Sequence, residues 1–253
     1  MQTVLNTVSL ILLFAQSISA MTWTKTWENI LQGGPSRWKV DNLEAKQKAL
    51  RHILGYTQSQ GPLKIICPLA GDDPFVQYAW SQGHDVTAID LVPAAVKVMR
   101  EQFGGSELDW TKHEKESSTV VWKHASGRAT LYEGDMLAKR PELNNEFDAV
   151  YDKDSFGALD LKMRQPFCNR LSEYCKGDAI VYIEVKNKES GREFGPPYHV
   201  EKVKLMELES FGTVFTHLHS LGEVYPLQMP GMSQTGHILQ RRIDGECSSS
   251  RDI

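Results

Sequence analysis

Apolar residues recur at helical spacing over residues 41–54, and the segment over residues 63–69 that follows is apolar at every position except Lys64. The first pattern predicts an amphipathic helix with Asp41 as its N-cap, because a short polar side chain accepts hydrogen bonds from free backbone N–H groups there. The second pattern is typical of a strand that is buried on both faces of a parallel sheet. A helix over residues 73–82 is expected next, since proline fits the first helical turn.

The same alternation continues toward the C-terminus. A strand over residues 85–90 precedes a helix that begins at Pro93 and ends before Gly104, and this β-α-β-α order predicts a parallel sheet. The pattern therefore indicates an α/β fold with a mostly parallel sheet, helices on both faces and antiparallel pairing at the C-terminus. After a polar insertion, the remaining expected elements are a hairpin over 118–124 and 128–135, a strand within 146–156, a helix over 163–175, a strand over 178–186, a loop and helix over 195–211, and strands within 213–224 and 236–242.

The composition is that of an ordinary globular protein. Its 253 residues carry a formal net charge of −4, from 28 basic and 32 acidic residues. Because there is no basic excess and no basic run, the sequence argues against nucleic acid and against a membrane surface as partners. Four cysteines are too few and too scattered for a disulfide scaffold, and no CxxC pair indicates zinc. We expect a small-molecule partner and a monomeric protein.

Residues 1–20 carry no charged side chain, and their apolar centre is about ten residues long. This segment is too short to span a membrane and fits a signal peptide, which would direct the chain to the secretory pathway. Met21 is the alternative start, and translation from it would leave the protein in the cytoplasm. We expect a single domain over residues 21–242 and a disordered tail over residues 243–253.

Candidate chemistry lies where the strands end, because ligands of an open α/β sheet bind outside the carboxyl ends of its strands. The first strand ends at Ala70 and Gly71, and two carboxylates follow, Asp72 and Asp73. A dinucleotide site needs three glycines at this turn, and these carboxylates would repel a pyrophosphate. They are tolerable beside a cationic cofactor that has no phosphate. S-adenosylmethionine is such a cofactor.

Two later strand ends supply further carboxylates. Asp90 lies about 20 residues past Gly71, where an acidic side chain accepts hydrogen bonds from both ribose hydroxyls. Asp135 would receive the adenine amino group, and Met136 would pack on the ring. The spacing of these residues in a β-α-β frame predicts an S-adenosylmethionine site.

Two histidines alternate on a predicted C-terminal strand. Because side chains at alternate positions point the same way, we expect His217 and His219 to share one face of that strand. A metal pair would fit there, but the sequence offers no evident third ligand, and we expect no metal.

Six short motifs occur in order between Trp23 and Gln240: WTKTW, PLAG, QGHDVTAIDL, GRATLYEGDM, AVYDKDSFGALD and GPPYHV. In their order and spacing they resemble the thiopurine S-methyltransferase family. The resemblance implies a class I methyltransferase fold, which is Rossmann-like, and transfer of a methyl group from S-adenosylmethionine to a small acceptor, mostly to sulfur. Related members accept thiols, halide ions or selenium compounds.

The resemblance also implies roles for single residues. Trp23 and Trp27 match amino-terminal tryptophans of a segment that would close over the cofactor, and Trp38 matches an aromatic position that faces the acceptor. Lys153 lies where the family often has arginine beside the reacting sulfur. The implied cofactor positions are Trp23, Trp27, Trp38, Leu69, Ala70, Gly71, Asp90, Leu91, Gly134, Asp135, Met136 and Lys153.

Methyl transfer to sulfur requires a thiolate, and a simple thiol has a pKa near 8.5. A nearby Lys153 ammonium would favour the anion by Coulomb attraction. Asp152 would instead accept a proton through water, and we favour Lys153 of these two hypotheses. The loop over residues 192–200 has two prolines after a glycine and would form a stiff cover near the acceptor, with Tyr198 or His199 lining it.

Three functions remain open at this point. The first is methyl transfer to a small thiol, and the second is transfer to a halide or another soft anion. The sequence does not separate these two, because both need only a small pocket near a cation. The third is a non-catalytic S-adenosylmethionine-binding protein of the same fold, since Ala70-Gly71-Asp72 replaces the usual Cys-Gly-Lys and Lys153 replaces arginine. The presence of Asp90 and Asp135 argues against this third function.

Overall fold

The computed structural model describes residues 25–34, 42–114, 119–191, 196–207, 209–227 and 230–243. The expected signal segment, Trp23, Trp38 and the tail beyond residue 243 lie outside these residues. Among the described helices, none is long and apolar enough to cross a membrane.

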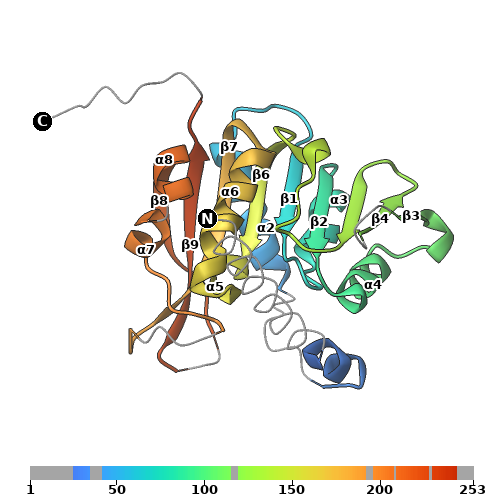
Figure 1. Cartoon of the computed structure of the whole chain (residues 1–253), viewed down its shortest axis with the longest axis horizontal. Helices are drawn as coiled ribbons and strands as arrows, with labels where there is room; N and C mark the ends of the chain where they lie inside the picture. Colours follow the sequence, from blue (N-terminus) through green and yellow to red (C-terminus); the bar gives the residue numbers. More distant parts are fainter. Residues whose placement is uncertain are drawn as a thin grey trace, which may run out of the picture.

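A nine-stranded sheet forms the centre of the described structure, in the order β3-β4-β5-β2-β1-β6-β7-β9-β8 (Figure 1). The five strands β5, β2, β1, β6 and β7 are parallel, and antiparallel pairing adds β4 and β3 at one edge and β9 and β8 at the other. The predicted α/β fold with a mostly parallel sheet is therefore confirmed. The strands are β1 (Lys64–Pro68), β2 (Asp85–Asp90), β3 (Trp110–Glu114), β4 (Val120–His124), β5 (Ala129–Glu133), β6 (Phe147–Lys153), β7 (Cys175–Lys188), β8 (Phe215–Tyr225) and β9 (Met232–Arg241).

Helices cover both faces of the sheet. Buried side chains of α2, α3 and α4 pack on one face, and those of α6, α7 and α8 pack on the other. Residues 65–67 of β1 alternate between these two cores, which explains why the strand is apolar after its first residue. The helices are α2 (Leu43–Tyr56), α3 (Phe75–Ser81), α4 (Pro93–Gln102), α5 (Ser155–Ala158), α6 (Leu161–Tyr174), α7 (Lys202–Glu207) and α8 (Glu209–Val214), with 3-10 turns η1 (Glu107–Asp109) and η2 (Pro141–Leu143).

A stack of aromatic rings joins the first helix after β1 to the centre of the sheet. The rings of Phe75 and Tyr151 stack with centroids 3.7 Å apart, and Tyr182 lies parallel to Tyr151 at 5.7 Å. All three side chains are buried. Because Phe75 is the first residue of α3, this stack fixes where that helix begins relative to β6 and β7.

Two local expectations were wrong. Asn42, rather than Asp41, is the N-cap of α2, and its Oδ1 accepts hydrogen bonds from the backbone N–H groups of Glu44 and Ala45 at 2.9 and 3.4 Å. The polar insertion before the hairpin contains an additional strand, β3, in which only Trp110 is buried. An edge strand with four exposed polar residues has no apolar alternation, so its sequence does not indicate a strand.

The expectation that His217 and His219 share a face was also wrong. A β-bulge separates them, so that His217 pairs with Leu239 and His219 pairs with Ile238 on β9. His217 Nε2 lies 3.2 Å from Nδ1 of His237, whereas His219 lies near Tyr56 of α2 on the other face. Within the described residues, no group of three or more histidine, cysteine or acidic side chains is arranged to hold a metal ion.

We expect the substitution Phe75→Ala to lower the free energy of unfolding by about 3–5 kcal/mol, because it leaves a cavity within the aromatic stack. Urea denaturation followed by circular dichroism would measure this loss. Leu108→Ala is the matched control, because Leu108 is 92% exposed and its truncation should change stability by less than about 0.5 kcal/mol. A loss below about 1 kcal/mol for Phe75→Ala would show that the stack does not hold α3 in place.

Candidate functional site

The turn that follows β1 has an unusual backbone. Leu69 and Gly71 both have positive φ values, +44° and +57°, a conformation that glycine adopts readily and leucine adopts rarely. The Ala70 N–H group donates to the Ile89 carbonyl at 3.2 Å, which extends the pairing of β1 with β2 into the turn. The turn is thereby held at the carboxyl ends of the parallel strands, which we call the carboxyl edge of the sheet. The sequence predicts that the cofactor binds there.

Asp90 ties this turn to the end of β2. One carboxylate oxygen accepts a hydrogen bond from Gly71 N–H at 2.8 Å, and the other accepts one from Val92 N–H at 2.9 Å. The side chain is only 8% exposed, and burial raises its pKa to about 6, against the hydrogen bonds that lower it. Each oxygen of a carboxylate has two lone pairs, so Asp90 keeps acceptor capacity for a ligand that lies above the turn.

The loop after β5 lies directly beside Asp90. Gly134 N–H donates to the Asp90 carbonyl at 2.8 Å, and Asp135 Oδ1 accepts from Leu137 N–H at 2.8 Å. The Arg140 guanidinium donates to the Asp135 carbonyl at 2.8 Å, which restrains the backbone of the loop. These contacts bring Gly134 and Asp135 to the same edge as Asp90.

Two apolar residues near this loop differ in their exposure. The Met136 side chain is 1% exposed and belongs to the core, whereas Leu91 is 40% exposed. Met136 is therefore placed beneath the loop, and Leu91 offers the open apolar surface beside Asp90. Of the two, Leu91 is the residue whose side chain is accessible to an adenine ring.

Trp27 is the one predicted amino-terminal tryptophan that lies within the described residues. It belongs to a helical segment over residues 25–31, and its side chain packs on Val92 and Ala95 at the start of α4. The segment therefore lies beside the turn that follows Asp90. The expected roles of Trp23 and Trp38 concern residues outside the described structure.

Lys153, at the end of β6, is engaged in an ion pair. Its ammonium group lies 3.0 Å from Asp73 Oδ2, and both side chains are largely buried. Burial lowers the pKa of Lys153, but Asp73, Glu184 and Asp154 together outweigh it, and the net pKa is raised. Lys153 is thus a cation at neutral pH whose charge is offset by carboxylates.

The neighbouring Asp152 is fully buried. Its Oδ1 accepts from Ser155 N–H at 2.8 Å, and Oδ2 has no hydrogen-bond partner among the described residues. The Ser155 hydroxyl donates to the Pro68 carbonyl at 2.7 Å, which joins the ends of β6 and β1. Burial raises the pKa of Asp152 to about 7, although its hydrogen bonds with Ser155 act to lower it.

A buried polar cluster beside Lys153 was missed from the sequence. Glu184 on β7 accepts hydrogen bonds from the hydroxyls of Tyr182 and Tyr225, each at 2.7 Å. Lys186, two residues further along β7, pairs with Asp154 Oδ2 at 2.9 Å. The signal was present in the apolar run of this strand, since Glu184 and Lys186 interrupt it at alternate positions that share one face.

The cluster also includes a residue of β9. Gln234 donates to Asp154 Oδ1 at 3.1 Å and to Glu184 Oε2 at 3.2 Å, and its carbonyl oxygen accepts from the Lys186 ammonium. Gln234 is fully buried. It therefore links the two carboxylates and the lysine into one hydrogen-bonded group.

Tyr198, the predicted acceptor-lining residue, lies over the other face of the β6 end. Its backbone N–H donates to the Gly157 carbonyl at 2.8 Å, and its hydroxyl donates to Asp160 Oδ1 at 2.9 Å. The Arg164 guanidinium lies over both the Tyr198 ring and the Phe156 ring. These contacts hold the loop that contains Tyr198 against α5 and α6.

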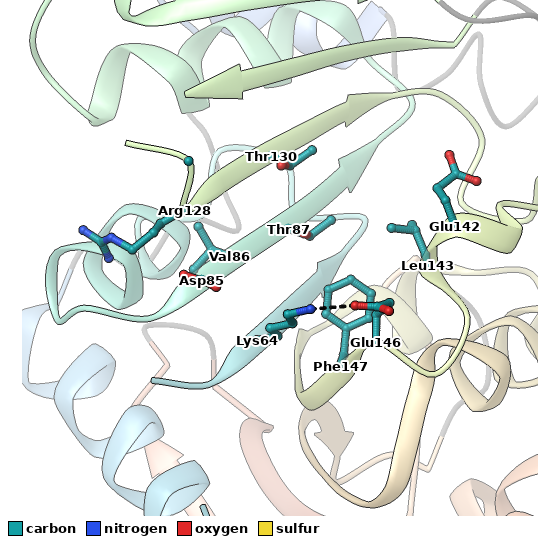
Figure 2. Close-up of a pocket in the computed structure, with 11 residues that line it drawn as sticks. Lys64, Asp85, Val86, Thr87, Arg128, Thr130, Glu142, Leu143, Glu146 and Phe147 are labelled. Carbon is teal, nitrogen blue, oxygen red and sulfur yellow. Dashed lines mark hydrogen bonds and ion pairs between the residues drawn. The ribbon is translucent and has the colours of Figure 1, made fainter. Parts of the chain in front are cut away.

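A separate surface pocket of about 180 Å³ lies at the opposite edge of the sheet (Figure 2). Lys64, Asp85 and Phe147, which begin β1, β2 and β6, contribute to its lining, and Lys64 pairs there with Glu146 at 2.6 Å. None of the predicted cofactor or acceptor residues lines it. The residues predicted from the sequence to bind the cofactor or the acceptor therefore lie away from this pocket.

The carboxyl edge fits S-adenosylmethionine in three respects. Gly71 has a positive φ and no side chain, so that the backbone of the turn is open to a ligand. The carboxylates of Asp90 and Asp135 end neighbouring strands, and no phosphate has to be accommodated beside them. The buried Asp152 oxygen, which has no hydrogen-bond partner among the described residues, adds acceptor capacity beside Ser155 and the end of β1.

We expect Asp152→Asn to stabilise the protein more at pH 8 than at pH 5. The pKa of Asp152 is about 7 in the folded chain and 3.8 in the reference state, so folding favours the protonated form. The folded chain holds this proton more tightly than the unfolded chain does. The free energy of unfolding of the wild type is therefore highest below pH 3.8 and falls as the pH rises through 7. The difference in unfolding free energy between the variant and the wild type should therefore grow by about 2–3 kcal/mol from pH 5 to pH 8. Urea titrations at both pH values measure this difference, and an equal effect at the two would contradict the raised pKa.

The sequence is similar to those of known proteins. A family model described as Thiopurine S-methyltransferase (TPMT) matches residues 20–227. A thiopurine S-methyltransferase of Xanthomonas axonopodis pv. citri (strain 306) is 24% identical over 162 residues, which cover 62% of this chain and 64% of that relative. The chain thus spans slightly less than two thirds of that relative. The enzyme of the same name from Psychrobacter cryohalolentis is 23% identical over 183 residues, covering 69% of this chain and 82% of the relative.

Solved structures share the fold at low identity. A 1,6-didemethyltoxoflavin-N1-methyltransferase of Burkholderia thailandensis, with bound 1,6-didemethyltoxoflavin and S-adenosylhomocysteine, has a TM-score of 0.60 and 16% identity, covering 91% of this chain and 89% of that one. A TehB-like SAM-dependent methyltransferase of Corynebacterium glutamicum has a TM-score of 0.54 and 14% identity, covering 88% and 98%. With the family match over most of its length, the chain belongs to the thiopurine S-methyltransferase family and has the fold of class I S-adenosylmethionine-dependent methyltransferases.

Proposed function

We propose that the protein transfers the methyl group of S-adenosylmethionine to the sulfur of a small thiol acceptor. The observation that carries the proposal is the joint placement of Gly71, Asp90 and Asp135 at one edge of a class I methyltransferase sheet. The family match supports both the donor and the sulfur acceptor. The bound cofactor supplies a methyl carbon that is activated by its sulfonium.

The residues of the chain would hold the donor from its nucleoside end. Asp90 accepts hydrogen bonds from the ribose hydroxyls with the lone pairs that Gly71 and Val92 leave free, and Leu91 packs against the adenine. Asp135 accepts from the adenine amino group. Asp152 and Lys153, at the end of β6, would lie on the acceptor side of the site.

The acceptor would then react in two steps, loss of its proton and attack on the methyl carbon. The S–H bond breaks, its proton passes to the Asp152 carboxylate through water, and the electron pair stays on the acceptor sulfur. That sulfur forms a bond to the methyl carbon while the bond between this carbon and the sulfonium breaks, and its electron pair remains on the departing sulfur. Alignment of the reacting atoms contributes up to roughly 10 kcal/mol to such a displacement. The Lys153 ammonium favours the thiolate over the thiol.

The two alternatives are less well supported. Transfer to a halide would use the same site beside Lys153, and it is less well supported because the matching family model is described by methyl transfer to sulfur. A non-catalytic binding protein would need no residue that takes up a proton, whereas Asp152 combines burial with a pKa of about 7. All three hypotheses require that the protein binds S-adenosylmethionine. Calorimetry tests this requirement, and the absence of binding would exclude all three.

We expect Asp90→Asn to weaken binding of S-adenosylhomocysteine by about 10–100-fold, because it removes charge-assisted hydrogen bonds to the ribose. Isothermal titration calorimetry would measure the dissociation constant. Asp85→Asn is the matched control, because Asp85 begins the same strand that Asp90 ends. Equal affinities for the two variants would exclude Asp90 as the ribose ligand.

We expect Lys153→Met to raise the apparent acceptor pKa in the pH–rate profile by about 1 unit, because the nearby positive charge is lost. The readout is kcat/KM for a small thiol across pH 6–10, which spans the roughly 8.5 of a simple thiol. Lys176→Met serves as the control, since Lys176 forms a more exposed ion pair with Asp148 at the other end of the parallel strands. An unshifted profile would remove Lys153 from this role.

A further inference from the structure

The loop between β5 and η2 contains a buried guanidinium group. Arg140 is buried, and its Nη1 atom donates hydrogen bonds to the carbonyls of Asp135 and Ala138 at 2.8 and 3.3 Å. The Asp135 carbonyl also accepts from Ala138 N–H at 3.1 Å, so two donors hold it in place. One arginine therefore closes the loop over residues 134–140 onto its own first turn.

The same guanidinium fits closely against Gly134, the first residue of this loop. A Cβ atom at Gly134 would lie 3.0 Å from Arg140 Nη2 and 3.2 Å from Thr119 Oγ1, which is tighter than ordinary van der Waals contact. The guanidinium also lies over the Tyr132 ring, whose centroid is 5.3 Å from Arg140 Cζ. Arg140 thus follows the loop from the end of β5 to its own backbone.

Stability alone does not explain this arrangement. The Nε and Nη2 atoms of Arg140 are buried and have no hydrogen-bond partner in the part of the chain that the structure describes. A buried donor without a partner is unfavourable, so the two hydrogen bonds that Nη1 makes are partly offset within the same side chain. What this guanidinium provides, and an apolar side chain of similar length would not, is a fixed position for the Asp135 backbone.

Further contacts fix the direction of the Asp135 carboxylate. Its Oδ1 atom accepts from Leu137 N–H at 2.8 Å, while Arg140 holds the carbonyl of the same residue. Gly134 N–H donates to the Asp90 carbonyl at 2.8 Å, which ties the loop to the end of β2. A carboxylate held in this way discriminates strongly between a ligand that donates a hydrogen bond to it and one that cannot, because the second leaves it unpaired.

We propose that Arg140 is a positioning residue that makes the Asp135 loop selective for adenine over hypoxanthine. The proposal rests on the function proposed above, in which Asp135 accepts a hydrogen bond from the adenine amino group. Hypoxanthine has a carbonyl oxygen in place of that amino group, so it cannot donate there, and the carboxylate repels it. Arg140 acts through the backbone of the loop and needs no contact with the ligand.

The test compares binding of S-adenosylhomocysteine and S-inosylhomocysteine by isothermal titration calorimetry. We expect the wild type to prefer the adenosyl ligand by about 100-fold, and Arg140→Met to reduce this preference by about tenfold, mainly by weakening the adenosyl ligand. Arg140→Lys keeps the positive charge and a donor, and it should retain part of the preference. Arg128→Met is the matched control, because Arg128 Nη1 also donates to two carbonyls, those of Trp80 and His84, near the opposite end of β5.

Gly134→Ala tests the same geometry while Arg140 is still present. Its methyl group would displace the guanidinium and should reduce the preference for the adenosyl ligand. In the Arg140→Met background the same substitution should reduce the preference no further, because its effect passes through the guanidinium.

An Arg140→Met protein that is folded by circular dichroism and keeps the wild-type preference would overturn the inference, as would equal affinities of the wild type for the two ligands. If Arg140→Met does not fold, an unchanged preference in both Arg140→Lys and Gly134→Ala would overturn it. A wild-type chain that binds neither ligand would contradict the proposed function itself, and this inference with it.

Discussion

The site depends on the hydrogen bonds that Asp90 accepts from the backbone of two turns. A parallel sheet brings the ends of β1 and β2 to one edge, but it does not by itself fix the loops that leave them. The hydrogen bond from Gly71 N–H to the Asp90 carboxylate, at 2.8 Å, fixes the first loop. The hydrogen bond from Val92 N–H to the same carboxylate, at 2.9 Å, fixes the second. A single buried carboxylate thereby sets the position of the glycine turn and of the helix α4, on which Trp27 packs.

Burial of charge is the second organising constraint. A carboxylate removed from water needs hydrogen-bond donors or a counter-ion, and the structure supplies both in different places. Asp90 has backbone donors, Asp73 and Asp154 have lysines, and Glu184 has two tyrosine hydroxyls. Asp152 is the exception at this edge, since one of its oxygens has no partner among the described residues. It is therefore the carboxylate with the most to gain from a ligand or a bound water.

The sequence predicts the fold through features that act locally. Apolar runs mark the buried strands β1 and β2, and Pro93 marks the start of α4. The strand ends that carry Asp90, Asp135 and Lys153 follow from topology alone, because parallel strands present their carboxyl ends together. Those positions are therefore accessible to sequence reasoning.

Features that depend on contacts between distant segments are less accessible. The pairing of Lys153 with Asp73 joins residues 80 positions apart, and that of Gln234 with Asp154 does the same. The bulge that separates His217 from His219 depends on the pairing of β8 with β9. Neither local propensity nor spacing encodes such partners. Even so, a glutamate and a lysine at alternate positions of a buried strand are a sign that partners exist.

The raised pKa of Asp90 has a consequence for energetics beyond the choice of ligand. Near pH 6 a fraction of the molecules carries a proton on this carboxyl. If Asp90 binds the ribose as proposed above, two donated hydrogen bonds favour its ionised form, so association would release that proton into the buffer. The measured heat of association then includes the buffer's own ionisation enthalpy, and affinity weakens on acidification even though no group of the ligand titrates on the ribose.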